Sequence, residues 1–150
     1  MKISIDINTS GKNPADSTEK AVQKVFSAVI SRGTRAAVAL RNSELRVLSG
    51  KRSGRVYRKP HTKKAVYTAS APGEPPAVCT NALRDHFNPN SGVSIQSGYV
   101  TVRPYIVSSE KYAGYLEEGT RRMAPRPFRE RVITEAKPEI MRIYSEPYLK

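Results

Sequence analysis

At 150 residues the chain is long enough for one domain with its own core and too short for two. Its hydrophobic content of 38% is below the globular average, which favours exposed arms or contacts between subunits. Its one cysteine, Cys79, excludes an internal disulfide and suits a reducing cytoplasm, and no apolar run is long enough for a membrane span or a signal peptide. An excess of 26 Lys and Arg over 13 Asp and Glu gives a net charge of +13, which favours nucleic acid, an acidic membrane or an acidic partner; a solvated basic surface without a specific ligand is the alternative.

The first part of the chain predicts one strand followed by one long helix. Ile3, Ile5 and Ile7 alternate with polar residues, which is typical of a half-buried strand. A helix is predicted over residues 17–41, because apolar residues recur there at helical spacing, at Val22, Phe26, Val29, Ala36 and Leu40. Gly33 lies inside it and costs about 1 kcal/mol relative to alanine, so it marks a bend, a close helix crossing or a tolerated weak spot.

The most basic segment follows this helix, at residues 49–64. It has no acid and seven cations: Lys51, Arg52, Arg55, Arg58, Lys59, Lys63 and Lys64. Val-Tyr pairs at 56–57 and 66–67 flank residues 59–62, which predicts a hairpin arm with a charged tip. Charge this dense cannot pack unpaired in a core, so we expect the arm to be exposed.

The middle of the chain predicts an extended segment, a short helix and a hairpin. Three prolines and a glycine at about 69–79 favour an extended surface segment. Thr80 is expected to cap a short helix over residues 81–86. Residues 92–96 and 99–104 then alternate in polarity and predict a hairpin around the two residues between them.

A helix, a glycine stop and a second helix are predicted over residues 112–132. Tyr112, Tyr115 and Leu116 have the i, i+3, i+4 spacing that places side chains on one helical face. Gly119 can take the positive φ that ends a helix, and Pro127 suits a first helical position.

The last helix should start near Pro127, because apolar residues repeat every four positions, at Phe128, Val132, Ala136, Ile140 and Tyr144. At Pro138 we expect a kink rather than a stop, since the apolar stripe continues past it. The sequence thus predicts a single α+β domain over residues 1–150: a small antiparallel sheet packed with one long N-terminal helix and a C-terminal helix, plus an extended basic hairpin arm at about 50–68.

Two blocks of the sequence carry a resemblance to a known family. One is Ala-Pro-Gly-Glu-Pro-Pro leading to Thr-x-x-Leu-Arg, within residues 70–87, and the other comprises Tyr112, Ala113, Glu117, Gly119, Thr120, Pro125, Pro127 and Phe128. Together and in this order they resemble the neck proteins of long-tailed bacteriophages, also called head–tail joining or tail-completion proteins. The chain departs from that pattern at Glu118, where an aromatic is usual, at Asn81, where glycine is usual, and at Cys79, where an acid is usual.

The resemblance implies a structural role in the virion. It implies a homo-oligomeric ring, hexameric if it matches the tail tube, between the head connector or stopper protein and the tail tube or tail terminator protein. The ring would seal the head–tail junction, pass genomic DNA through its lumen, and assemble in the host cytoplasm. We expect an inter-subunit joint at Tyr112, Tyr115, Glu117, Glu118, Gly119, Thr120, Arg121, Arg122, Pro125, Pro127 and Phe128. In it, Glu117 and Glu118 are expected to pair with Arg121, Arg122 or a neighbouring subunit.

No catalytic set, cofactor site or metal site is predicted, so we expect a protein that is not an enzyme. His61 lies among like charges at the expected arm tip, where a solvated histidine is the usual state. Cys79 and His86 could share a metal, but two ligands do not make a zinc site. The alternative function is a basic nucleic-acid-binding protein, in which the cations of residues 51–64 contact phosphates and the interleaved tyrosines stack on bases.

Overall fold

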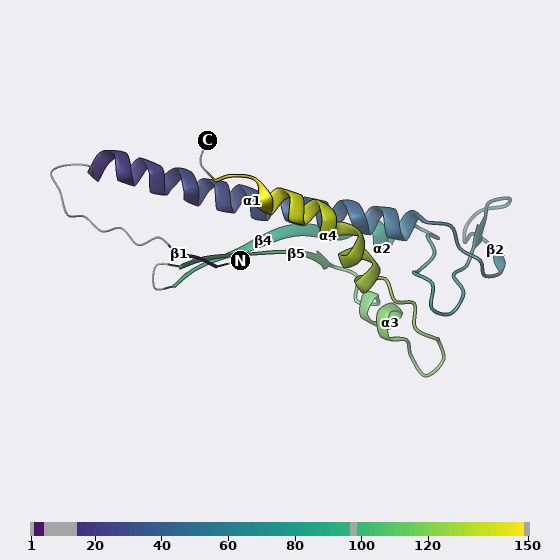
Figure 1. Cartoon of the computed structure of the whole chain (residues 1–150). Helices are drawn as coiled ribbons and strands as arrows, with labels where there is room; N and C mark the ends of the chain where they lie inside the picture. The colour runs from purple at the N-terminus through teal and green to yellow at the C-terminus, as the bar shows by residue number, and fades with distance from the viewer. Residues whose placement is uncertain (1, 5–14, 97–98, 149–150) are drawn as a thin grey trace.

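A long helix lies along one face of a three-stranded antiparallel sheet, and a second helix lies beside the first (Figure 1). The computed structural model describes residues 2–4, 15–96 and 99–148. The elements in chain order are β1 (Lys2–Ser4), α1 (Ala15–Ser49), β2 (Val56–Arg58), β3 (Val66–Thr68), α2 (Ala82–Asp85), β4 (Phe87–Gln96), β5 (Tyr99–Ser108), α3 (Ala113–Glu118) and α4 (Arg129–Ser145). The strand order β1-β5-β4 and the separate β2-β3 pair give the α+β arrangement that the sequence predicts.

Helix α1 continues to Ser49, so the predicted end at residue 41 is wrong. The extension has a physical reason, because the inward positions after Leu40 are polar. Ser43 and Glu44 are fully buried there, and Leu48 resumes the apolar face one turn later. These two buried polar residues interrupt the apolar pattern by which a helix is recognised in the sequence.

The first core cluster joins α1 to the sheet at its closest approach. Val29 of α1 packs with Val100 and Val102 of β5. At Gly33, a Cβ atom would lie 2.1 Å from Cγ1 of Val102. Of the alternatives for this glycine, the structure supports a close approach, but to the sheet rather than to another helix.

The second core cluster lies where α1 ends. Leu48 packs there with Phe87 at the start of β4 and with Phe128 and Val132 at the start of α4. The rings of Phe87 and Phe128 meet edge to face with their centroids 6.1 Å apart. This cluster holds together segments that are distant in the sequence, and it lies beside the region where the arm begins.

The main hairpin is longer than predicted, because its ladder pairs Phe87 with Ser108 and runs to Gln96 and Tyr99. Residues 88–92 read Asn-Pro-Asn-Ser-Gly, a loop-like composition that an edge strand tolerates. Part of the expected first strand, Ile5 and Ile7, and the turn at 97–98 lie outside the described residues.

Helix α4 continues through Pro138 to Ser145, as expected of a proline that does not stop the helix. The segment after it is held on α1 by Arg32, whose Nη2 donates to the carbonyl oxygen of Pro147 at 2.8 Å. The same guanidinium lies 3.6 Å from the ring centroid of Tyr148. Arg35 of α1 forms an ion pair with Glu146 at 2.6 Å. Residues 146–148, which follow α4, are therefore tied to the middle of α1.

Candidate functional site

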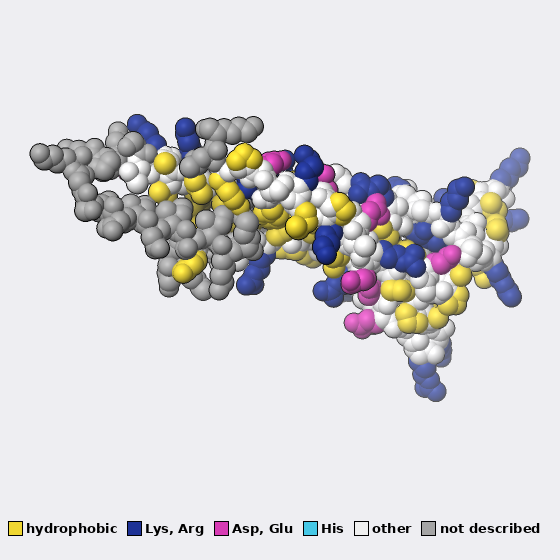
Figure 2. All heavy atoms as spheres, in the orientation of Figure 1, with side chains coloured by type: hydrophobic (Ala, Val, Ile, Leu, Met, Phe, Trp, Pro, Cys, Tyr) yellow, Lys and Arg dark blue, Asp and Glu magenta, His cyan; other side chains and the backbone are white. Residues whose placement is uncertain are grey.

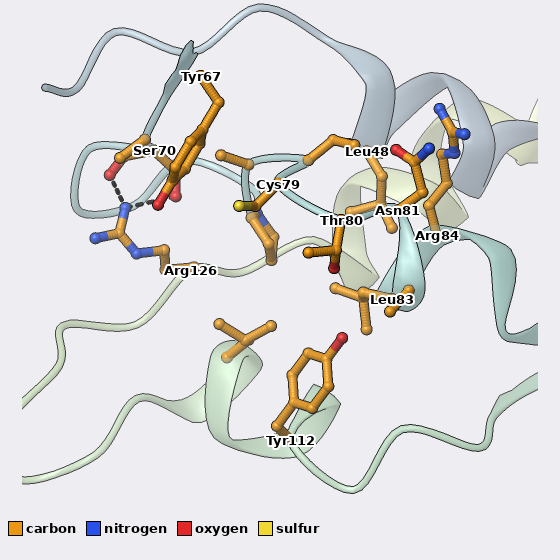
Figure 3. A pocket seen from close by; sticks show the side chains of 16 residues that line it. Leu48, Tyr67, Ser70, Cys79, Thr80, Asn81, Leu83, Arg84, Tyr112 and Arg126 are labelled. Atoms are coloured by element: carbon orange, nitrogen blue, oxygen red, sulfur yellow. Dashed lines mark hydrogen bonds between the residues drawn. The ribbon is translucent and has the colours of Figure 1, made fainter. Parts of the chain in front are cut away.

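The arm, the proline-rich segment, α2, α3 and the ends of α1 and α4 converge at one end of the molecule (Figure 1). A cavity of about 300 Å³ lies among them, lined by residues of α1, the arm, the proline-rich segment, α2, α3 and the loop before α4. Figure 3 shows side chains from five of these segments around it, among them Leu48, Tyr67, Cys79, Leu83 and Tyr112. Residues of both sequence blocks, 70–87 and 112–128, thus line the same space.

Arg126 clamps the two blocks together. Its Nη1 donates to the hydroxyl of Ser70 at 2.6 Å and to the carbonyl of Ala71 at 2.9 Å, and it also bonds the carbonyl of Ser70 (Figure 3). The amide of Gly73 donates to the carbonyl of Pro125 at 3.1 Å. Sequence reasoning missed Arg126; its position between the two motif prolines was the available signal.

Glu74 ties the base of the arm to the proline-rich segment. Its Oε1 accepts from the Ser53 hydroxyl at 2.6 Å, and its Oε2 accepts from the amides of Ala71 at 2.9 Å and Ser53 at 3.1 Å. The bond from the Ser53 hydroxyl, followed by those from the two amides, lowers the pKa of Glu74 to about 2. The motif glutamate is therefore a structural acceptor that stays ionised.

Arg52 also serves the fold rather than a partner, although the sequence grouped it with the contact residues. Its guanidinium donates to the carbonyls of Val47 at 2.8 Å, Leu48 at 3.1 Å and Pro76 at 3.0 Å. It therefore satisfies the last carbonyls of α1 and holds the proline-rich segment against them. Burial lowers the pKa of Arg52.

Basic side chains project from the end of the molecule that carries the arm (Figure 2). In the described part of the chain, no carboxylate lies within ion-pair distance of Lys51, Arg55, Arg58, Lys59, Lys63 or Lys64. Lys59 is half-buried and the other five are exposed. The arm thus carries its charge where a partner can reach it.

The arm is a two-stranded ribbon with two different faces. Tyr57 and Tyr67 lie opposite each other on one face, with ring centroids 6.1 Å apart, and Tyr67 lines the cavity. Val56 and Val66 lie on the other face and are 64% and 58% exposed. At the tip, His61 has a φ of 59°, so the expected loop histidine lies in an exposed tight turn.

The predicted joint begins at α3, whose side chains divide between two faces. Tyr112 and Leu116 line the cavity, while Tyr115 is 64% exposed and does not line it. Of the three side chains expected on one face, the cavity therefore takes Tyr112 and Leu116, and Tyr115 at the edge of that face points to solvent.

The glycine stop has the positive φ that the sequence predicts, with Gly119 at φ 79° and ψ −179°. This is not the left-handed helical conformation but a region that only glycine adopts readily. Its amide donates to the carbonyl of Tyr115 at 2.9 Å and closes α3. Thr120 and Met123 then pair through two backbone bonds, so Arg121 and Arg122 form an exposed basic tip below α3 (Figure 2).

Glu117 caps the last helix instead of pairing with Arg121 or Arg122. Its Oε2 accepts from the amides of Phe128 at 3.0 Å and Arg129 at 3.2 Å. Phe128 has a φ of −131°, so α4 begins at Arg129, two residues after the predicted start at Pro127. A carboxylate supplied by α3 satisfies the first amides of α4, which couples the two helices across the loop.

The short helix α2 begins with a left-handed residue. Asn81 has a φ of 67° and serves as the N-cap, so the expected cap at Thr80 is wrong. Asparagine is among the few residues that accept this conformation in place of glycine. Cys79 lines the cavity, and His86 Nδ1 pairs with a carboxylate oxygen of Glu110.

Within the described ranges, no three His, Cys, Asp or Glu side chains lie close enough together to hold a metal ion. None of the described helices is both long and apolar enough to cross a membrane. No protein-family model, curated protein or solved structure matches this chain. The site is therefore assigned from its contacts: a clamped junction that carries two exposed basic tips.

Proposed function

We propose that this chain is a structural subunit of the neck of a long-tailed bacteriophage. It forms a homo-oligomeric ring that joins the head connector to the tail tube and lets genomic DNA pass. The proposal is based on the two sequence blocks that resemble neck proteins, and the arrangement of these blocks in space supports it.

The observation that carries the proposal is that the two blocks fold into one unit. Arg126 bonds Ser70 and Ala71, and both blocks line one cavity. Three motif positions also show the backbone that a glycine motif requires: Gly73 and Gly119 have a φ of 79°, and Asn81, where the family usually has glycine, has a φ of 67°. Motif residues that meet in space and have the backbone geometry of a glycine motif support a shared structural role for the two blocks.

The exposed tips support an assembly role. Six arm cations and the Arg121–Arg122 tip project from the clamped junction, where they can reach another subunit, a neighbouring neck protein or DNA in the lumen. A ring subunit needs two different surfaces that contact its neighbours, and protruding tips can supply them.

The test is a variant in which Arg55, Arg58, Lys59, Lys63 and Lys64 become serine. Arg52 is kept because it caps α1. We expect a folded protein from which heads and tails fail to join, or necks that leak DNA. The matched control replaces five exposed cations elsewhere with serine, at Lys24, Arg103, Lys111, Arg129 and Lys137, and should join normally. A cryo-electron-microscopy map of the virion neck that lacks this chain, or holds a single copy, contradicts the proposal.

Nucleic-acid binding in its own right is the second candidate, favoured by the six arm cations without a described carboxylate partner. A dedicated binder would show a log–log salt slope near −0.9 for each duplex phosphate contacted. Tight binding of the wild-type protein to a defined DNA sequence at physiological salt, together with normal head–tail joining by the five-serine variant, would replace the neck assignment with this one.

A further inference from the structure

The face of the arm opposite its tyrosines, here called the outer face, carries two exposed valines and Arg58, and Val66 also borders a hollow at the end of α1 beside Leu48 and Val78. Val56 and Val66 lie diagonally across the two strands on the face away from the tyrosines, and both are more than half exposed. Arg58 shares this face, because it pairs with Val66 across the ribbon. A two-stranded ribbon with exposed valines is marginally stable alone in water, so this face gains from a partner that is apolar at its centre and acidic at its edge.

The outer face of α3 has the complementary composition. Tyr115 is 64% exposed, and Glu118, one turn later on the same side, is exposed as well. Residues 110–118 contain three carboxylates against one lysine, in a chain whose net charge is +13. Glu110 pairs with His86 and Glu117 caps α4, so the acidic group that this face offers beside Tyr115 is Glu118.

The two outer faces cannot meet within one chain. The inner face of the arm, through Tyr67, and the inner face of α3, through Tyr112 and Leu116, line the same cavity. Val56 and Tyr115 lie on the opposite sides of these elements and do not line it. Both elements nevertheless belong to the end of the molecule where α1 finishes, with the arm projecting beyond that end and α3 lying to one side of it (Figure 1).

We propose that the outer face of the arm of one copy docks on the outer face of α3 of a second copy. Valines contact Tyr115 at the centre, and Arg58 approaches Glu118 at the edge. The contact joins two different surfaces, so repeated around an axis it produces a closed ring when the rotation closes. The inference rests on the proposed ring function, for which it identifies the subunit contact.

Charge exchange tests the contact in solution. Arg58→Glu and Glu118→Arg are each expected to weaken self-association, measured by sedimentation velocity, by roughly tenfold, because each turns an attraction into a repulsion. The double variant should recover most of the wild-type association. The control Lys137→Glu makes the same charge change on the exposed side of α4 and should have no effect. Additive losses in the double variant overturn the proposal, and so does loss of DNA binding in Arg58→Glu with self-association unchanged.

Cross-linking separates this proposal from the neck assignment. In a Cys79→Ser background, a copy with Val56→Cys is mixed under oxidising conditions with a copy carrying Tyr115→Cys, at the highest soluble concentration. We expect a disulfide between the two copies, and none when the second copy carries Met141→Cys, at an equally exposed position on α4. Equal cross-linking of both pairs, or none, overturns the docking mode, and a neck map can still support the ring. If the specific cross-link forms but the protein is absent from virion necks, the docking of the arm on α3 is supported and the proposed neck function is contradicted.

Discussion

Replacing Gly33 with alanine should destabilise the protein, against the usual effect of that change in a helix. Alanine in place of glycine inside a helix stabilises by about 1 kcal/mol. Here the new Cβ would lie 2.1 Å from Cγ1 of Val102, well inside any van der Waals contact. Val102 is 5% exposed and packs in the core between α1 and the sheet, so it has little room to move.

The cost of overpacking decides whether Gly33→Ala stabilises or destabilises the protein. Forcing a methyl group into a filled core costs about 1–3 kcal/mol, and a clash this short belongs at the upper end. Subtracting the helix gain leaves a net loss of about 1–2 kcal/mol, which lowers the melting temperature by roughly 2–8 °C for a domain of this size. Thermal and urea unfolding followed by circular dichroism measure it.

Two further variants make this prediction sharp. Gly114→Ala, inside α3, meets no atom within 4 Å and should stabilise or leave stability unchanged. Val102→Ala removes the clashing methyl group, so Gly33→Ala should cost less in that background than in the wild type. A Gly33→Ala protein that gains stability as Gly114→Ala does, with no coupling to Val102→Ala, would refute the close approach of α1 to β5.

Three other changes probe the buried carboxylate and the joint. Burial raises the pKa of Glu44 to about 7 despite the neighbouring Arg41, so the folded chain binds the proton more tightly than the unfolded chain does. The free energy of unfolding should therefore fall by up to roughly 3 kcal/mol as the pH rises from about 4.5 through 7. Glu44→Gln should remove this pH dependence, measured by urea unfolding at pH 5 and pH 8. Gly119→Val should lose about 1–3 kcal/mol in thermal unfolding, because its φ is 79° and the new Cβ would lie 2.8 Å from the carbonyl oxygen of Met123; a variant that melts like wild type would contradict this. Glu117→Gln should lose about 1 kcal/mol by weakening the cap on α4, whereas the exposed Glu118→Gln should lose nothing; equal melting temperatures would argue against the cap.

The sequence predicts element types well here and element ends poorly, and the reason is specific. Helix α1 was expected to end at residue 41 because Ser43 and Glu44 occupy inward positions, and a polar residue in a core breaks the apolar period on which the prediction depends. Strand β4 was expected to start at Gly92 because the five residues before it have a turn-like composition. Their strand conformation comes from pairing with β5, a tertiary interaction that no local pattern carries.

The contacts of the candidate site were harder to predict than its position. From the sequence, Glu117 was expected to pair with a nearby arginine or a neighbouring subunit because of its charge, and Arg52 was expected to contact a partner because it belongs to a dense run of cations. In the structure both side chains satisfy free backbone groups at helix ends, Glu117 at the start of α4 and Arg52 at the end of α1. Side chains that cap a helix can be recognised only when the first and last residues of that helix are known, and sequence patterns place those residues poorly.

The anchoring of the arm explains how so much charge can be exposed without loosening the fold. In the described part of the chain no carboxylate pairs with the six outer cations of the arm, so ion pairs there do not hold the arm in place, and its charges repel one another and the rest of a basic chain. Its base is held instead by Glu74, which bonds Ser53, and by Arg52, which bonds the end of α1 and Pro76. These contacts keep the tip cations uncommitted while fixing where they point. In the ring proposed above, an arm held at its base would lose less conformational entropy on assembly than a free one.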